Sequence, residues 1–263
     1  MNTNFMFIHG LFGSSRCWME LVGCMPNTAI NKIPDLPKHG REISDNGLLS
    51  IPRVAQTLAR GLPQNSIIVA NDVGAKIALE IAAHSMNQVA GLVLINGQTL
   101  TSTPEQAIQD FFESAMVRGY DAIATDYVKG GAKGTLPAAR VSDLVRESKK
   151  PGLLPIGEYW MSIARWDSSR FKKCLDDVAC PILALQSADL DDNYNQNFAM
   201  NGLSSAKWME SLSRFSDARI IEIPDTGTYP MIRAPKAMAH AVCEFAKGAL
   251  QEAAPKEARE MVA

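Results

Sequence analysis

Short runs of Val, Ile, Leu, Phe and Ala recur along the chain and constrain its fold more than any other feature. Runs that are apolar at nearly every position suit parallel strands buried on both faces of a sheet. Helical patterns separate most of them, which predicts an α/β fold with a doubly wound, mostly parallel sheet. The predicted strands are NFMFI (4–8), TAINKIP (28–34), SIIVA (66–70), VAGLVLING (89–97), PILALQS (181–187) and ARIIEIP (218–224).

The alternation stops between residues 99 and 179, where the sequence carries helical patterns and no strand-like run. We expect a helical lid inserted over the carboxyl edge of the sheet, because ligands bind at this edge in open α/β sheets. The predicted organisation is a core of residues 1–98 and 180–250, a lid of 99–179 and a polar tail of 251–263. The predicted lid helices are PEQAIQDFFESAMV (104–117), LPAARVSDLVRES (136–148) and GEYWMSIARW (157–166).

The composition argues against several classes of partner. A net charge of −2 without a long basic block disfavours nucleic acid and anionic membranes. No run reaches the ~18 apolar residues of a membrane span, and the start of the chain lacks the basic region of a signal peptide. The five cysteines form no CxxC pair, and cysteines and histidines do not cluster as metal ligands do. We therefore expect a cytoplasmic protein with reduced thiols, no metal and no cofactor.

The segment SIIVANDVGAKIALEIAAH (66–84) predicts a strand, a tight turn and a helix. Ala70 and Gly74 are small, as a sharp strand-to-helix turn requires. The turn places Asp72 at a helix N-terminus, where the helix dipole favours negative charge. Asp72 is therefore the first candidate for a catalytic group.

The order of motifs resembles the α/β-hydrolase superfamily over nearly the whole chain. FIHGLFGSSRCW resembles its HGxxG stretch, PDLPKHGRE its DLPGHGxS loop, VANDVGAKIALEIA its nucleophile elbow, and IPDTGTYPMIRAP the GHxPMxExP stretch that carries its histidine. The resemblance implies an α/β-hydrolase fold. Because the chain begins at the third strand of the family pattern, a six-stranded core is expected.

The same resemblance implies roles for individual residues. The elbow residue, Asp72, takes the position of the nucleophile, and the backbone amides of Leu11 and Val73 form the oxyanion hole. His9 shapes the oxyanion loop. The residues expected to line the substrate pocket are His9, Phe12, Tyr159, Trp160 and Tyr229.

The sequence departs from the family at the histidine and the acid. Thr228 stands where the histidine is expected, and Thr228 and Tyr229 offer hydroxyl groups there. The other three histidines after His9 fall at His39, in a structural loop, at His84, far along the elbow helix, and at His240, inside the last helix. The sequence does not single out one residue for the acid position, because Asp189, Asp191 and Asp192 all lie near it.

Three functions remain open. Asp72 acts as a base in a one-step elimination, lyase, cyclisation or isomerisation reaction of a small carbonyl, ester or lactone metabolite; we take this as the leading hypothesis. Alternatively it is a nucleophile, as in dehalogenases and epoxide hydrolases. Thirdly, the chain is an inactive pseudohydrolase that binds a ligand or protein, because Asp tolerates the positive φ of an elbow. The expected partner is a small molecule, and the oligomeric state, a homodimer included, stays open.

Overall fold

The computed structural model describes residues 2–39, 47–85, 88–132, 134, 136–188, 202–215, 218–224 and 226–253. Its centre is a six-stranded sheet in the order β2-β1-β3-β4-β6-β8, in which every neighbouring pair is parallel. This confirms the predicted fold class and strand number. The strands are β1 (Thr3–Ile8), β2 (Ala29–Lys32), β3 (Ser66–Asn71), β4 (Val89–Ile95), β6 (Ile182–Ser187) and β8 (Ala218–Ile223).

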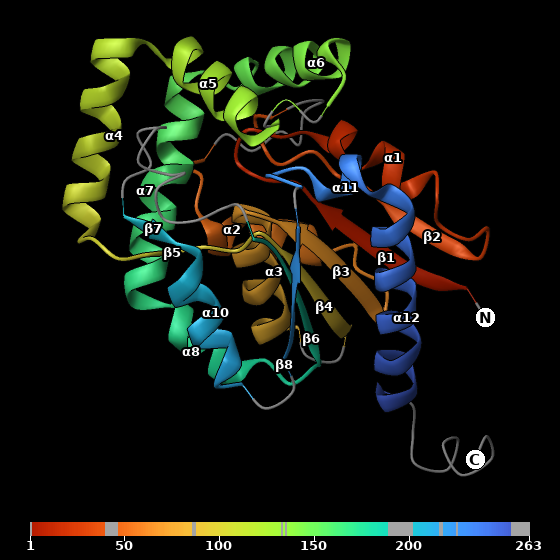
Figure 1. The fold of residues 1–263 in the computed structure, drawn as a ribbon. Helices are drawn as coiled ribbons and strands as arrows, with labels where there is room; N and C mark the ends of the chain where they lie inside the picture. Colours follow the sequence, from red (N-terminus) through yellow and green to blue (C-terminus); the bar gives the residue numbers. More distant parts are fainter. Residues whose placement is uncertain are drawn as a thin grey trace.

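Helices cover both faces of this sheet (Figure 1). On one face lie α2 (Ile51–Ala59) and α3 (Val73–His84), with α8 (Phe171–Asp177) packed against α3 and α10 (Ser205–Ser213) against β8. On the other face lie α1 (Met19–Val22), which follows a short 3₁₀ turn (Ser15–Trp18), α11 (Pro230–Arg233) and α12 (Pro235–Ala253).

The buried side chains form two apolar clusters, one on each face of the sheet. Met6 and Ile8 of β1 belong to the cluster with α2 and α3, while Phe5 and Phe7 belong to the cluster with α12. Successive strand residues thus alternate between faces, and both faces are buried. This is why the strands read as continuous apolar runs in the sequence.

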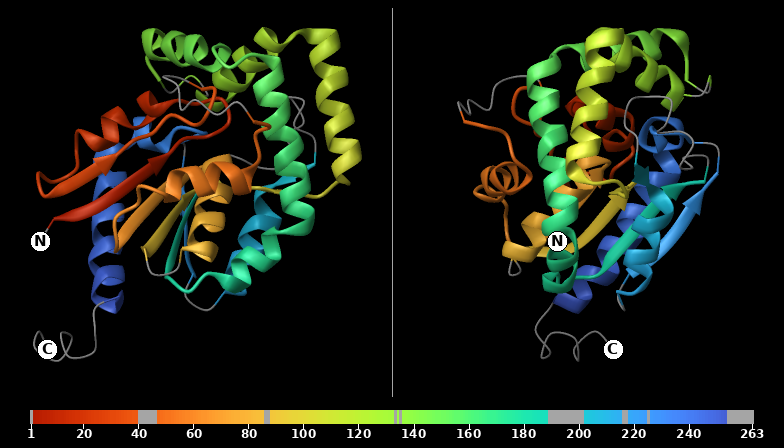
Figure 2. Two further views of the ribbon diagram at one scale, coloured as in Figure 1. Left: turned by 180° about the vertical axis from the view of Figure 1, so that it is seen from behind. Right: turned by 90° about the vertical axis from the view of Figure 1, so that its left-hand side faces the viewer.

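The segment between β4 and β6 is mainly helical and forms what we call the helical insertion (Figures 1 and 2). It starts with a two-residue strand, β5 (Thr99–Leu100), which pairs antiparallel with β7 (Leu203–Ser204) and was not expected from the sequence. Its helices are α4 (Pro104–Arg118), α5 (Tyr120–Ala132), α6 (Ala138–Lys149), α7 (Leu153–Ser169) and α8. Whether the insertion moves as a lid stays a prediction.

Two segments, one in the first 25 residues and one at the end of the last helix, differ from the sequence-based expectation. The last helix begins at Pro235 and continues to Ala253, so the first residues of the expected polar tail are helical, and residues 254–263 lie outside the described part. The sequence SSRCWMELVGCM (14–25) carries a helical pattern, but the structure forms a 3₁₀ turn followed by the four-residue α1 there. No helix in the described residues is long and apolar enough to cross a membrane.

Candidate active site

Asp72 lies at the sharp turn between β3 and α3. Its backbone has φ 55° and ψ −121°, in the region that non-glycine residues rarely adopt. The helix that follows packs tightly on β1, since a Cβ added to Gly74 would lie 2.5 Å from the Ile8 carbonyl oxygen. A small residue is therefore required at Gly74, and the turn presents the Asp72 side chain at the helix N-terminus.

The oxyanion loop after β1 contacts this carboxylate directly. The backbone N–H of Leu11 donates to Asp72 Oδ2 at 2.9 Å, and the neighbouring amide of Val73 lowers the pKa of the same carboxyl group. Of the two amides expected to receive a substrate oxygen, that of Leu11 thus binds the protein's own carboxylate. Gly10 permits this approach, because a Cβ there would lie 2.9 Å from both Cβ and Oδ2 of Asp72.

The environment of Asp72 changes its acidity. Burial raises the pKa of this carboxyl above its ordinary value, and the amides of Leu11 and Val73 and the charge of Lys76 oppose that rise only in part. A carboxyl group with a raised pKa is a stronger base than an exposed aspartate once it is ionised.

A small cavity of about 10 Å³ adjoins Asp72. This volume suffices for about one water molecule. Its walls come from the oxyanion loop, the turn before α3, helix α5 of the insertion and the loop that leads into α11. The lining residues are His9, Gly10, Phe12, Gly13, Cys17, Trp18, Asn71, Asp72, Tyr127, Thr228, Tyr229 and Met231.

His9 lines the cavity, but both of its ring nitrogens lie against backbone groups. Its Nε2 accepts from the Leu36 amide at 2.9 Å, and its Nδ1 lies 2.8 Å from the Gly10 carbonyl oxygen. Burial, followed by the proximity of His39, lowers its pKa to about 3. His9 is therefore a neutral structural group that shapes the oxyanion loop, and it is unsuited to proton exchange near neutral pH.

His39 also contacts the oxyanion loop, through the Leu11 carbonyl. Its Nε2 lies 2.6 Å from the carbonyl oxygen of Leu11, and burial lowers the pKa of its ring. The remaining two histidines are exposed, with His84 near the end of α3 beside Glu80 and Arg170 and His240 on α12. Neither lines the cavity at Asp72.

Thr228 and Tyr229 line the cavity, both buried, in the loop after β8. This loop is fixed by its neighbours: the Thr228 amide donates to the Gly131 carbonyl at 3.1 Å, and Asn96 Nδ2 donates to the Gly227 carbonyl at 3.1 Å. The three aspartates considered for the acid position, Asp189, Asp191 and Asp192, lie outside the described residues.

The aromatic residues near the site, from the oxyanion loop and from the insertion, divide between the cavity lining and the core. Phe12 lines the cavity and packs against Tyr127 with ring centroids 4.7 Å apart. Tyr159 and Trp160, which we expected in the pocket, are fully buried and lie outside its lining. The Tyr159 hydroxyl donates to the Pro37 carbonyl at 3.2 Å, and Trp160 Nε1 donates to the Ala107 carbonyl at 2.8 Å. Both side chains therefore pack the insertion. The expectation was wrong because helical periodicity alone does not tell which side of α7 faces the site.

Five lining side chains were not expected from the sequence: Cys17, Trp18, Asn71, Tyr127 and Met231. Asn71 directly precedes the elbow residue and Met231 follows Tyr229 closely, so position next to a motif was an available signal for both. Cys17 and Trp18 lie in the 3₁₀ turn after the oxyanion loop, and nothing local distinguishes Tyr127 from the other aromatic residues of the insertion. In the described part of the chain, His, Cys, Asp and Glu side chains form no group of three that suits a metal ion.

Comparison with known proteins agrees with the fold. A pimeloyl-[acyl-carrier protein] methyl ester esterase of Aromatoleum aromaticum is 24% identical over 261 residues, covering 92% of this chain and 98% of the esterase. Among solved structures, an esterase from Thermogutta terrifontis superposes with a TM-score of 0.76 at 18% identity, covering 95% of this chain and 91% of the other.

An enol-lactonase from Burkholderia xenovorans superposes with a TM-score of 0.71 at 14% identity, covering 94% of this chain and 92% of that one. At these identities the likeness of the solved structures shows the fold. The model of the Alpha/beta hydrolase family matches residues 5–241, nearly the whole chain, and the protein therefore belongs to that family.

Proposed function

We propose that the protein is a hydrolase in which Asp72 is the nucleophile and forms an ester with its substrate. The observation that carries this proposal is the hydrogen bond from the Leu11 amide to Asp72 Oδ2. It fixes one oxygen of the carboxylate in the oxyanion hole and leaves the other oxygen, Oδ1, to react. Relatives named esterase and enol-lactonase support hydrolysis as the overall reaction.

The chemistry follows from this arrangement in two steps. Oδ1 attacks a saturated carbon of the substrate and expels its leaving group, which gives an Asp72 ester. Water then adds to Cγ of that ester, and the negative charge develops on Oδ2, which the Leu11 amide already contacts. Collapse cleaves the bond between Cγ and Oδ1, which leaves as the oxygen of the product alcohol, and the Asp72 carboxyl group is restored with the water's oxygen. The aromatic lining favours a small apolar substrate.

The positions of the histidines support a slow second step. The ring nitrogens of His9 lie against backbone groups, and His39, His84 and His240 lie outside the cavity lining. Positioned general-base help is worth roughly 10²–10⁴-fold in rate. We therefore expect the Asp72 ester to be long-lived enough to detect.

A second candidate keeps Asp72 as a general base in a one-step reaction of a carbonyl, ester or lactone substrate. The raised pKa of the Asp72 carboxyl favours it, because a base with a pKa nearer neutrality transfers protons more effectively. It requires Asp72 to leave the amides so that they can receive the substrate oxygen.

Isotope labelling separates the two candidates. The protein is incubated in H₂¹⁸O with panels of haloalkanes, epoxides, esters and lactones, and its intact mass and the peptide that contains Asp72 are analysed by mass spectrometry. The nucleophile predicts an adduct on Asp72 and, after turnover, ¹⁸O in the Asp72 carboxylate. The general base predicts turnover with no adduct and with ¹⁸O, where water is incorporated at all, in the product alone.

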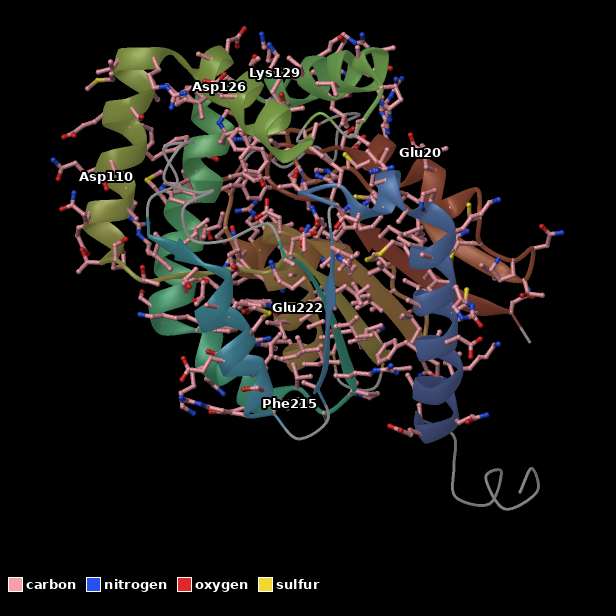
Figure 3. The ribbon with its side chains drawn as sticks, in the orientation of Figure 1. Glu20, Asp110, Asp126, Lys129, Phe215 and Glu222 are labelled. Carbon is pink, nitrogen blue, oxygen red and sulfur yellow. The ribbon has the colours of Figure 1, made fainter. Side chains whose placement is uncertain are left out.

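Matched variants complete the test. Asp72→Asn removes the reacting oxygen and is expected to abolish both the adduct and turnover. Asp110→Asn makes the same change on the outer helix α4, at the left of Figure 3, and is expected to behave as the unaltered protein. Turnover that survives Asp72→Asn contradicts both candidates, and binding without turnover on any panel supports the pseudohydrolase.

A further inference from the structure

The cavity beside Asp72 is lined by three polar side chains whose functional atoms have no protein partner. These atoms are Trp18 Nε1, Asn71 Oδ1 and Thr228 Oγ1. The three residues are 0%, 7% and 5% exposed, respectively. Six such atoms occur in the described part of the chain, and half of them belong to the lining of this one small cavity.

Leaving these atoms unpaired is costly. A buried polar atom without a hydrogen bond destabilises the folded state, and nearly all such groups in native proteins have a partner. Three of them around one cavity therefore point to a small polar occupant rather than to three separate defects.

The three atoms match the bonding capacity of a single water molecule. The Trp18 indole N–H only donates, the Asn71 amide oxygen only accepts, and the Thr228 hydroxyl does either. A water that accepts from Trp18, donates to Asn71 and shares a bond with Thr228 satisfies all three. The cavity volume of about 10 Å³ is close to the minimum for one water, and buried waters make two to four hydrogen bonds.

Hydrogen bonds to the Gly227 carbonyl fix the backbone directly before Thr228. Ser187 Oγ donates to the Gly227 carbonyl at 2.7 Å, and the Ser187 amide donates to Asn96 Oδ1 at 2.9 Å. Asn96 in turn binds the same Gly227 carbonyl. The end of β6 and the end of β4 thus fix the loop residue that precedes Thr228.

We infer that Trp18, Asn71 and Thr228 hold one water molecule against Asp72, and that this water hydrolyses the Asp72 ester. The second half of the inference rests on the proposed function. The water oxygen bonds to Cγ, the bond from Cγ to Oδ1 breaks, and a water proton ends on Oδ1, which departs as the oxygen of the product alcohol. An ester and a water thus give a carboxylic acid and an alcohol, with Thr228 as a positioning residue in the place where the family carries its histidine.

The binding half is tested by a high-resolution crystal structure of the unliganded protein. We expect a single density peak at hydrogen-bonding distance, about 2.7–3.2 Å, from the three atoms. A cavity without density, or the three side chains bonded to other protein groups, overturns the water site. In Thr228→Val, which keeps the shape of the side chain and removes the hydroxyl, the peak is expected to weaken or move.

The catalytic half is tested by following the Asp72 ester over time by mass spectrometry. Thr228→Val is expected to slow ester hydrolysis roughly tenfold, the effect of losing one buried hydrogen bond, and to leave ester formation unchanged. Thr228→Ser keeps the hydroxyl and is expected to restore hydrolysis. Thr99→Val, a buried threonine in β5 outside the cavity lining, is the control for loss of a buried hydroxyl.

The outcomes separate this inference from the proposed function. Equal slowing of formation and hydrolysis in Thr228→Val, or no slowing, overturns the role of the water although the ester still forms. If no panel compound gives an ester, the proposed function and the hydrolytic role fall together. The density in the cavity then decides the water site by itself.

Discussion

The raised pKa of Asp72 has a consequence for stability. The folded protein binds the Asp72 proton more tightly than the unfolded chain does, so the ionised carboxylate lowers the free energy of unfolding. This loss is absent below the ordinary aspartate pKa of 3.8, develops as the pH rises through the folded value, and is complete above it. We expect Asp72→Asn to melt at a higher temperature than the unaltered protein at neutral pH, with the difference shrinking as the pH falls toward 3.8.

Thermal denaturation followed by circular dichroism over a pH series measures this difference. Asp110→Asn, on α4, is the control for the exchange of a carboxylate for an amide away from the site. A variant at Asp72 that melts at or below the temperature of the unaltered protein at neutral pH would show that the amides of Leu11 and Val73 stabilise the charge more than burial destabilises it.

Gly10 gives a second prediction, because it is the point of closest approach between the oxyanion loop and the elbow. In Gly10→Ala the new methyl group would lie 2.9 Å from Asp72 Oδ2 and must displace the carboxylate from the Leu11 amide. A misplacement of about 1 Å costs on the order of 10²-fold in rate, so we expect ester formation on Asp72 to slow by about that factor.

The matched control is Gly248→Ala on α12, where an added Cβ meets nothing within 4 Å. This change is expected to leave ester formation unaltered and to stabilise the helix by roughly 0.5–1 kcal/mol. If Gly10→Ala reacts as fast as the control, the contact between the loop and Asp72 does not position the nucleophile.

Helix α3 connects the site to the insertion through buried charges. Lys76 Nζ donates to Asp167 Oδ1 of α7 at 2.5 Å and to the Gln98 carbonyl at 2.6 Å, and Asp167 Oδ2 accepts from the Leu100 amide at 2.8 Å. Burial raises the pKa of Asp167 despite its lysine partner. Lys76→Met therefore leaves an unpaired buried carboxylate and is expected to cost about 3–5 kcal/mol of unfolding free energy.

Adding Asp167→Asn to Lys76→Met removes the buried negative charge that has lost its lysine partner. The side-chain oxygen of the new asparagine still accepts from the Leu100 amide. We expect the double variant to recover a substantial part of the loss, so that the two single changes are not additive. Chemical denaturation of the four proteins of this cycle gives the coupling energy. Additive costs would mean that the two side chains do not depend on one another.

The elements of this fold were accessible from the sequence because they rest on local pattern. Apolar runs such as Ile67–Val69 predict buried parallel strands, and the small residues around Asp72 predict the elbow. Neighbours of motifs, such as Phe12 and Thr228, were correctly placed at the cavity. Tyr159 and Trp160 were not, because tertiary packing decides which side of a buried helix faces a site. The hydrogen bond from the Leu11 amide to Asp72 depends on the contact of two loops that are far apart in the sequence, so no local sequence pattern predicts it.

The insertion is attached to the core at several points, which include an ion pair between Arg140 of α6 and Glu20 of α1. The firm attachment lies at the end of α7, where the acidic partners of two ion pairs are buried. Near the end of α7, Lys76 pairs with Asp167, and Arg170 forms an ion pair with Glu80, which also accepts from Trp166 Nε1 at 2.7 Å. At α5, the contacts with the site include ring packing of Phe12 against Tyr120 and Tyr127 and the bond from the Thr228 amide to the Gly131 carbonyl. Because the cavity holds about one water, a substrate enters only after part of this cover moves.

We therefore expect α5 to open while the end of α7 stays in place. In native-state hydrogen exchange, amides of Tyr120–Ala132 should exchange with a lower opening free energy than amides near Asp167, with buried strand β3 as the reference for global unfolding. Lys76→Met combined with Asp167→Asn is expected to bring exchange near residue 167 closer to that of α5, because the firm attachment is then weakened. Exchange at the end of α7 that is as fast as at α5 in the unaltered protein would mean that the whole insertion moves as one body, and that the buried ion pairs do not anchor it.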